Sequence, residues 1–144
     1  MAFWLMKSEP NVFSFADMMA KTQRGEPESW HGVRNYAARN NMKAMSIGDE
    51  AFFYHSNIGK EIVGIIRVIA LAHPDDTGEL NAKGEVVWEC VDVEAVKPLP
   101  RPVTLATIKA TPALAEIALV KLSRLSVSPV RDEEWKLICE MGGL

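Results

Sequence analysis

The stretch from Ala51 to Asn57, AFFYHSN, reads as a β-strand that ends on three hydrogen-bonding side chains. The run EIVGIIRVIALA follows at residues 61–72, and six of the eight residues from 62 to 69 are Ile or Val. Aromatic and β-branched residues favour strands over helices. The short linker between the two runs, NIGK, therefore predicts an antiparallel hairpin. Gly64 inside the second strand predicts a bulge or bend, which a sheet that closes into a barrel needs.

The residues before this hairpin predict one strand and two helices. The bulky run FWLMKSEP at residues 3–10 fits a strand, because a proline disfavours helix at the residue before it. Ser14 followed by Asp17 is typical of a helix start and predicts a helix over residues 14–23. Apolar residues at helical intervals predict a second helix over residues 32–45.

The residues after the hairpin predict a polar loop, a long strand and a largely helical C-terminal part. The strand is expected over residues 86–100 and is ended by Pro98 and Pro100. The other predicted elements are the loop at 73–85, helices at 104–110, 112–122 and 131–143, and an extended piece at 123–130. Together they predict an α+β fold, with a small, curved, mostly antiparallel β-barrel and flanking helices, in a single domain over residues 1–144.

Composition indicates a globular protein that needs no disulfide bond or structural metal ion for stability. The 144 residues are 48% apolar and 24% charged, which is typical of a domain large enough to bury a core. Cys90 and Cys139 lie far apart in apolar stretches, so both are expected to be reduced packing residues. We therefore expect a cytoplasmic protein, or a nuclear one if the source is a eukaryote.

Neither a signal peptide nor a membrane partner is expected. The N-terminal stretch MAFWLMKSEP lacks a basic start and is too short for a signal peptide. No apolar run reaches the ~18 residues that a membrane span needs. The longest run, residues 62–72, is interrupted by Gly64 and Arg67.

The charge distribution argues against a protein that coats nucleic acid without specificity. The formal net charge is −3, so long-range attraction to phosphates is weak. Residues 33–45 nevertheless contain Arg34, Arg39 and Lys43 and no acid. These three, with Arg124, are candidates for phosphate contacts, and the alternative is an ordinary solvated helix face.

No pattern in the chain is typical of a catalytic or metal centre. The three histidines have no metal-ligand spacing to one another, to a cysteine or to an acid. Ser56 follows His55 directly, but neighbours on a strand point to opposite faces and cannot form a nucleophile–base pair by themselves. Asp75 and Asp76 lie in the polar loop and are expected to be solvated. We expect no catalytic residue, no bound metal and no cofactor.

The four tryptophans are expected to have different roles. Trp4 and Trp135 lie in apolar elements, and core packing explains them. Trp30 lies in a polar loop beside a glycine, without an obvious packing role, and its flat face suits stacking on a base. Trp88 shares its strand with acidic residues and is either a core residue or the wall of a cleft.

Polar side chains gather where the predicted elements end. Such groups can read the hydrogen-bonding edge of a base while an aromatic face holds its plane. Caps, turns and solvent contacts explain each residue singly, but they explain the whole set less well. The set is Lys7, Ser8, Asn35, Tyr36, Ser56, Asn57, Ser123, Arg124 and Ser126.

Five separated segments make the chain resemble the EVE domain family of the PUA-like superfamily. They are WLMKSEP, W-H-GVRNYAARNNM, FFYHSN with IVGIIRV, VKPLPRPVTL, and SRLSVSPV-x-x-EEW. The match covers almost the whole chain in the family's order. The resemblance implies a small curved barrel with flanking helices and a pocket for one nucleobase. It also implies the kind of base, a C5-modified cytosine in DNA or a modified RNA base.

The same resemblance, extended to the related YTH domains, implies which residues form the pocket. Lys7, Ser8, Trp30 and Asn57 match YTH pocket positions, and Trp88 stands as a second wall. Asn35 with Tyr36, and the segment from Ser123 to Ser126, match motifs specific to EVE domains. Ser56 or Asn57 is expected to point at the base edge, with His55 facing away.

The chain is thus expected to be a non-catalytic, monomeric module that binds nucleic acid and captures one modified base. Two alternatives stay open. One is a module that binds a nucleoside or another small molecule in the same pocket. The other is an enzyme that acts on a nucleobase.

Overall fold

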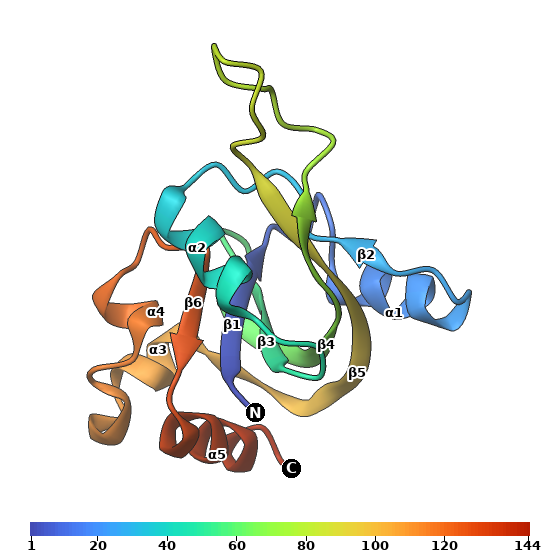
Figure 1. The fold of residues 1–144 in the computed structure, drawn as a ribbon. Helices are drawn as coiled ribbons and strands as arrows, with labels where there is room; N and C mark the ends of the chain where they lie inside the picture. Colours follow the sequence, from blue (N-terminus) through green and yellow to red (C-terminus); the bar gives the residue numbers. More distant parts are fainter.

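Six strands form one sheet in a computed structural model that describes all residues from 1 to 144 (Figure 1). The strand order is β2-β5-β4-β3-β1-β6. Strand β1 runs parallel to β3, whereas every other pair is antiparallel. The strands are β1 (Phe3–Ser8), β2 (Glu28–Ser29), β3 (Glu50–His55), β4 (Glu61–Pro74), β5 (Glu89–Thr104) and β6 (Val127–Val130). The prediction of an α+β fold with a mostly antiparallel sheet is confirmed.

The helices lie at the edges and ends of this sheet (Figure 1). They are α1 (Phe15–Gln23), α2 (Tyr36–Ala44), α3 (Leu105–Lys109), the 3-10 turn η1 (Pro112–Leu114), α4 (Ala118–Lys121) and α5 (Asp132–Met141). The single helix predicted over residues 112–122 is therefore wrong, because two short turns replace it. None of the helices combines the length and apolar character that a membrane crossing needs.

The sheet curves but does not close, so the predicted barrel is wrong. The outer strands β2 and β6 pair only with β5 and β1, and they do not pair with each other. Helix α2 contacts both β5 and β6 and bridges the two sides of the curved sheet (Figure 1). Strand β2 is only two residues long, so it offers little backbone with which to continue a ladder around a barrel.

The hairpin and its bulge are confirmed. Strands β3 and β4 pair antiparallel, and their register shifts where Phe53 and Tyr54 face Gly64 and Ile62. A Cβ atom at Gly64 would lie 2.3 Å from the Phe15 ring, so the missing side chain lets helix α1 approach the sheet. The glycine thus serves packing as well as the bend.

The helix boundaries follow their caps. Ser14 accepts from the backbone N–H of Asp17, and the Asp17 carboxylate accepts from that of Ser14, so the predicted start of α1 is confirmed. The predicted start of the next helix at residue 32 is wrong. Asn35 has extended backbone angles and its side chain accepts from Ala38 N–H at 2.9 Å, so α2 begins at Tyr36.

Strand β5 continues through Pro98, Pro100 and Pro102, where the sequence predicted an end. Beyond Val93 one edge of β5 has no neighbouring strand, because β2 pairs only with Asp92 and Val93. A proline lacks a backbone N–H, and at a free edge that absence removes no ladder hydrogen bond.

Two hydrophobic clusters cover the two faces of the sheet. Alternate residues of β1 and β3 divide between them, so that Trp4 and Phe53 belong to one cluster and Leu5 and Phe52 to the other. This is the two-residue period of a sheet buried on both faces. The core roles predicted for Trp4 and Trp135 are confirmed, since both side chains are buried.

The chain between β4 and β5, residues 75–88, projects from the sheet as a long loop (Figure 1). The predicted loop at 73–85 is displaced, because β4 extends to Pro74 and pairs with Glu89. At the tip, Asn81 accepts backbone N–H bonds from Lys83 and Glu85. The tip is therefore ordered by its own hydrogen bonds.

Candidate functional site

A hollow of about 310 Å³ opens where β1 ends. We call it the Trp30 hollow. Three of the predicted pocket residues line it, namely Lys7, Ser8 and Trp30. The remaining lining residues are Val12, Phe13, Glu28, His31 and Gly32. The hollow thus lies between the β1–α1 turn and the chain that follows β2.

Strand pairing and the turn after β1 fix Ser8. Its backbone carbonyl accepts from Ser56 N–H at 3.0 Å, which extends the β1–β3 pairing by one bond. Its hydroxyl donates to the Phe13 carbonyl at 2.6 Å. Because this donor is used, the Ser8 oxygen can act toward a bound molecule only as an acceptor.

Trp30 has the packing role that the sequence did not reveal. Its side chain is only 7% exposed and belongs to the hydrophobic cluster around Phe53. The two rings meet edge to face at 5.5 Å. The backbone N–H of Trp30 donates to the Val91 carbonyl at 2.8 Å and so continues the β2–β5 pairing. Trp30 is both a core residue and a wall of the hollow.

A buried carboxylate holds the segment that carries Trp30. Asp75 accepts from Gly32 N–H at 2.8 Å, from the Arg34 guanidinium at 3.1 Å and from Thr77 N–H at 2.8 Å. Burial opposes its ionisation, but the hydrogen bonds from Thr77, Gly32 and Arg34 hold its pKa at about 2. The prediction that Asp75 is solvated is wrong, whereas the neighbouring Asp76 is exposed.

A second hollow has a volume of about 350 Å³. It is lined by Asn35, Ala37 and the residues from Leu122 to Leu125, and we call it the Arg124 hollow. The Lys7 ammonium donates to the Ser123 carbonyl at 2.8 Å, so a residue that lines the Trp30 hollow is bonded to one that lines the Arg124 hollow. Burial lowers the Lys7 pKa. Arg124 is exposed and takes part in no ion pair within the chain.

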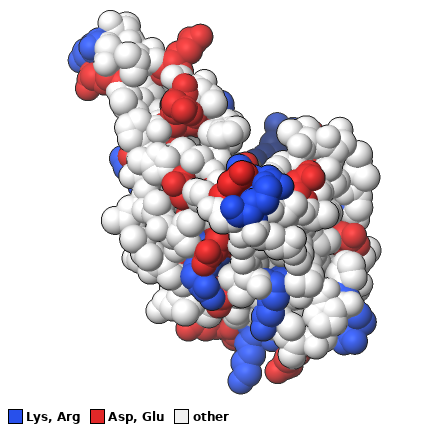
Figure 2. All heavy atoms as spheres, turned by 90° about the vertical axis from the view of Figure 1, so that its right-hand side faces the viewer, with Lys and Arg blue, Asp and Glu red and all other residues white.

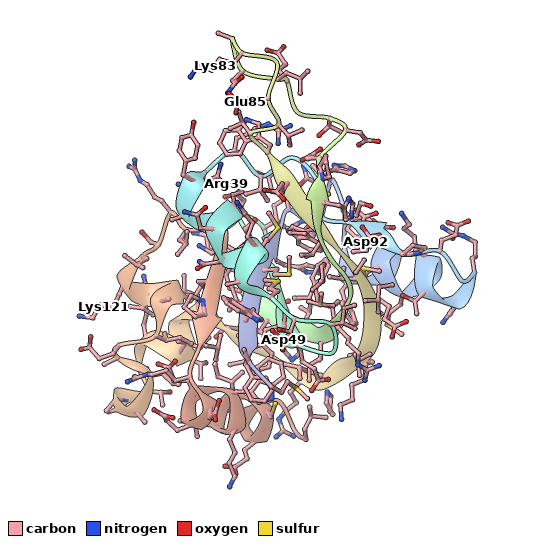
Figure 3. The ribbon with its side chains drawn as sticks, in the orientation of Figure 1. Arg39, Asp49, Lys83, Glu85, Asp92 and Lys121 are labelled. Carbon is pink, nitrogen blue, oxygen red and sulfur yellow. The ribbon has the colours of Figure 1, made fainter.

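Trp88 does not line the Trp30 hollow. Its ring stacks on Tyr36 at 5.0 Å between centroids. Arg34 lies over the Trp88 ring and Arg39 over the Tyr36 ring, at 5.5 and 5.0 Å. This stack fastens the base of the projecting loop to the start of α2, and Figure 3 shows Arg39 at that end of the helix.

Three of the four predicted phosphate contacts have partners within the protein. Arg34 pairs with Asp75, and Lys43 pairs with Glu89 at 3.4 Å. Arg39 donates to the Val87 carbonyl and to the Asn40 side chain. Arg124 is therefore the predicted phosphate contact that the fold leaves free.

The turn after β3 supports the Trp30 hollow without lining it. Asn57 adopts a left-handed backbone with φ 64°, and its amide donates to Glu9 at 2.6 Å. The backbone N–H of Ser56 donates to the Ser8 carbonyl, and the backbone carbonyl of Ser126 accepts from Lys7 N–H at 2.9 Å. His55 does not line the hollow, and its Nε2 accepts from Phe15 N–H at 3.1 Å. Its ring contacts Phe53, which itself packs on Trp30, so the expectation that His55 faces away is not confirmed.

Sequence reasoning missed Glu28, which lines the hollow beside Trp30. Its side chain is 15% exposed and pairs with Lys21 at 2.6 Å. A usable signal was present, because Glu28 and Trp30 are two residues apart in extended chain and such residues share a face. The hollow therefore contains one carboxylate that the sequence motifs did not identify as a candidate site residue.

The molecular surface has no single-sign patch on the face that carries α1 and β2. Figure 2 shows basic and acidic side chains interspersed there. Several of them pair with one another, including Lys21 with Glu28, Arg24 with Glu26 and Arg67 with Glu94. This agrees with the net charge of −3 and argues for contact at particular sites rather than over a broad basic surface.

Cys90, His73 and Asp92 form an arrangement like that of a cysteine hydrolase. His73 Nε2 lies 2.7 Å from Asp92, which Figure 3 labels, and its Nδ1 lies 3.9 Å from the Cys90 sulfur. The Cys90 side chain is buried, and burial with nearby carboxylates raises its pKa to about 11. A nucleophilic cysteine needs a lowered pKa and access to substrate, so this arrangement is unsuited to catalysis. No group of three or more His, Cys, Asp or Glu side chains is placed to hold a metal ion.

Comparison with known proteins identifies the family. A family model described as EVE domain matches residues 2–141. Mouse thymocyte nuclear protein 1 is 36% identical over 96% of this chain and 73% of its own. An uncharacterised protein of Schizosaccharomyces pombe is 37% identical over 96% of this chain and 67% of its own.

Solved structures agree with this assignment. A protein from Agrobacterium tumefaciens is 51% identical, with a TM-score of 0.92 over 100% of this chain and 94% of its own. The human THYN1 protein, solved in complex with DNA that contains 5-methylcytosine, is 32% identical, with a TM-score of 0.89 over 100% of this chain and 99% of its own. The ZmASCH protein from Zymomonas mobilis, 13% identical with a TM-score of 0.58 over 98% of this chain and 99% of its own, shares the fold. The chain belongs to the EVE domain family.

Proposed function

We propose that this chain binds DNA and takes a single C5-modified cytosine, extruded from the helix, into the Trp30 hollow. The observation that carries the proposal is the meeting of Lys7, Ser8 and Trp30 around one hollow of about 310 Å³. This volume is at the lower end of the range typical of ligand pockets. The human relative in complex with 5-methylcytosine DNA supports DNA rather than RNA as the partner.

Stacking on Trp30 can offset the cost of extruding the base, but selectivity for a modified base needs further contacts. Extracting a base from a duplex costs a few kcal/mol, and stacking on an aromatic side chain returns ~1–3 kcal/mol. An added methyl group in an apolar site contributes about 0.8 kcal/mol. The methyl group alone therefore gives only modest selectivity, and polar groups of the hollow must contribute the rest.

The Arg124 hollow favours a polynucleotide over a free nucleoside. One of its lining residues, Ser123, accepts a hydrogen bond from Lys7, which lines the Trp30 hollow. An exposed arginine without an internal partner suits a phosphate next to the captured base. A free nucleoside has no phosphate to offer it, so the second hollow supports the reader of DNA over the nucleoside-binding alternative.

The test compares two tryptophans that are equally buried. Trp30 is 7% exposed and Trp135 is 8% exposed, but Trp135 packs on the opposite face between Phe3 and Phe52. We expect Trp30→Phe and Trp135→Phe to lower the melting temperature to a similar extent. Only Trp30→Phe should weaken binding to an oligonucleotide with one 5-methylcytosine, by about tenfold, because it reduces the stacking face.

Fluorescence anisotropy with labelled duplexes measures this difference. If both variants bind like the unchanged protein, or if both weaken equally, the Trp30 hollow is not where the base is held. Trp30→Ala is a poorer test, because it would leave a cavity among the core residues around Phe53.

A further inference from the structure

Glu28 supplies the only carboxylate that lines the Trp30 hollow. One of its oxygens accepts from the Lys21 ammonium at 2.6 Å. The other has no partner in the chain, and it is not among the fully buried atoms that lack one. Glu28 therefore presents a free acceptor oxygen, and Lys21 holds the carboxylate in place.

The negative charge of Glu28 is neutralised by the adjacent Lys21 ammonium. An unpaired carboxylate would repel the phosphates of an approaching strand, whereas the Lys21–Glu28 pair is locally neutral. The pair also ties α1 to β2, so the free oxygen is positioned before any base arrives. Preorganisation of this kind strengthens a recognition contact because less ordering is needed on binding.

The acceptors in the hollow match the amino group of cytosine. A carboxylate only accepts hydrogen bonds, and the Ser8 hydroxyl already uses its O–H in a hydrogen bond to the Phe13 carbonyl. Cytosine carries an N4 amino donor, and thymine carries an O4 acceptor at the same position. 5-Methylcytosine and thymine share the C5 methyl group, so this position distinguishes them.

We propose that Glu28 makes the hollow select cytosine-type bases over thymine by accepting a hydrogen bond from the N4 amino group. The inference rests on the proposed function, since it concerns the base that the Trp30 hollow holds. Thymine in the same position would set its O4 against the Glu28 oxygen, and the two acceptors would repel each other.

The experiment uses two duplexes that differ in one base. One contains 5-methylcytosine and the other thymine, each opposite an abasic site, so that neither base must be unpaired from a partner. We expect the unchanged protein to bind the 5-methylcytosine duplex about tenfold more tightly or better, as a charged hydrogen bond predicts. Glu28→Gln should bring the two affinities within about twofold of each other, because an amide can also donate to O4.

Glu26→Gln is the matched control, since it removes a nearby carboxylate that pairs with Arg24 and does not line the hollow. It should keep the preference for 5-methylcytosine, and both variants are checked for an unchanged fold by circular dichroism. Equal affinity of the unchanged protein for the two duplexes overturns the inference. So does a preserved preference in Glu28→Gln, or an equal loss of preference in both variants. In each of these cases the protein still binds DNA, whereas failure to bind either duplex contradicts the proposed function itself.

Discussion

A single buried side chain, Asp75, organises the approach to the Trp30 hollow. It joins the projecting loop to Gly32 and to Arg34, and its carboxylate is fully buried. Gly32 has a φ of 86°, which side chains other than glycine rarely adopt. The Asp75 oxygen therefore holds a turn that the sequence alone would leave free to rearrange.

Replacing Asp75 should destabilise the protein and disturb the hollow together. Asp75→Asn puts an amide donor where the backbone and Arg34 already donate, so we expect the free energy of unfolding to fall by about 1–3 kcal/mol. The exposed neighbour offers a control, and Asp76→Asn should change little. Denaturant unfolding of the two variants checks this, and equal stability would show that the network around Asp75 is not needed.

Unfolding experiments in acid should also reveal how much the Asp75 carboxylate stabilises the fold. The pKa of Asp75 is lowered from its ordinary 3.8 to about 2 in the folded state. A carboxyl of this kind stabilises the fold fully above pH 3.8 and loses the contribution as the pH falls through about 2.

The sequence could predict the residues whose role depends on near neighbours. Lys7, Ser8 and Trp30 could be grouped because a strand end and a loop tryptophan are local patterns, and the three residues do line one hollow. The partners of Arg34 and Trp88 could not be found in this way. Asp75 is 41 positions from Arg34, and only the folded loop brings Trp88 onto Tyr36.

At the scale of the elements, one histidine joins β3 to α1. The N–H of Phe15 donates to His55 Nε2, so that nitrogen carries no proton and the ring is neutral. Burial lowers the His55 pKa below its ordinary 6.5, and the nearby Glu61 only partly opposes this. The junction of the strand and the helix is therefore sensitive to pH.

The bond between β3 and α1 should weaken in mild acid. A group with a lowered folded pKa contributes stability above its unfolded pKa, here 6.5, and loses it as the pH falls below that value. His55→Gln keeps an acceptor oxygen but does not titrate. We expect the unchanged protein to lose stability relative to His55→Gln between about pH 7.5 and about pH 5.5.

Melting temperatures across that range provide the measurement. His73 has the opposite sign, because its hydrogen bond to Asp92 raises its pKa, but both proteins contain it and the comparison cancels its effect. Parallel curves for the two proteins would contradict a titrating role for His55.

Element-scale patterns explain which parts of the fold were predictable. Strands β1, β3 and β4, the Ser14 cap and the Gly64 bulge follow from residues close in sequence, whereas the two-residue strand β2 was not predicted. Barrel closure was not predictable, because it depends on whether β2 and β6 meet across the sheet. The passage of β5 through Pro98 and Pro100 likewise depends on an edge that has no neighbour.

The whole molecule is slightly acidic and has one free predicted phosphate contact. The net charge of −3 and the interspersed surface charges predict a shallow dependence of affinity on salt. Each phosphate contact adds about 0.9 to the slope of log K against log salt concentration.

Arg124→Gln should reduce that slope by about one, because it removes one phosphate contact. Arg101→Gln is the matched control, since Arg101 is also exposed and free of ion pairs but lies beside the C-terminal Gly142. Titrations with a 5-methylcytosine duplex at several salt concentrations give the slopes. An unchanged slope in Arg124→Gln, or an equal drop in both variants, would show that Arg124 does not contact a phosphate.

The self-contained tip of the projecting loop makes it a natural point for attaching a reporter. Lys83 and Glu85 lie at the tip in Figure 3, and neither residue lines the Trp30 hollow or the Arg124 hollow. A dye joined to Lys83→Cys would meet little competition from the native thiols, because burial raises the pKa of both Cys90 and Cys139. Such a labelled protein could follow its own encounter with DNA while both hollows stay unmodified.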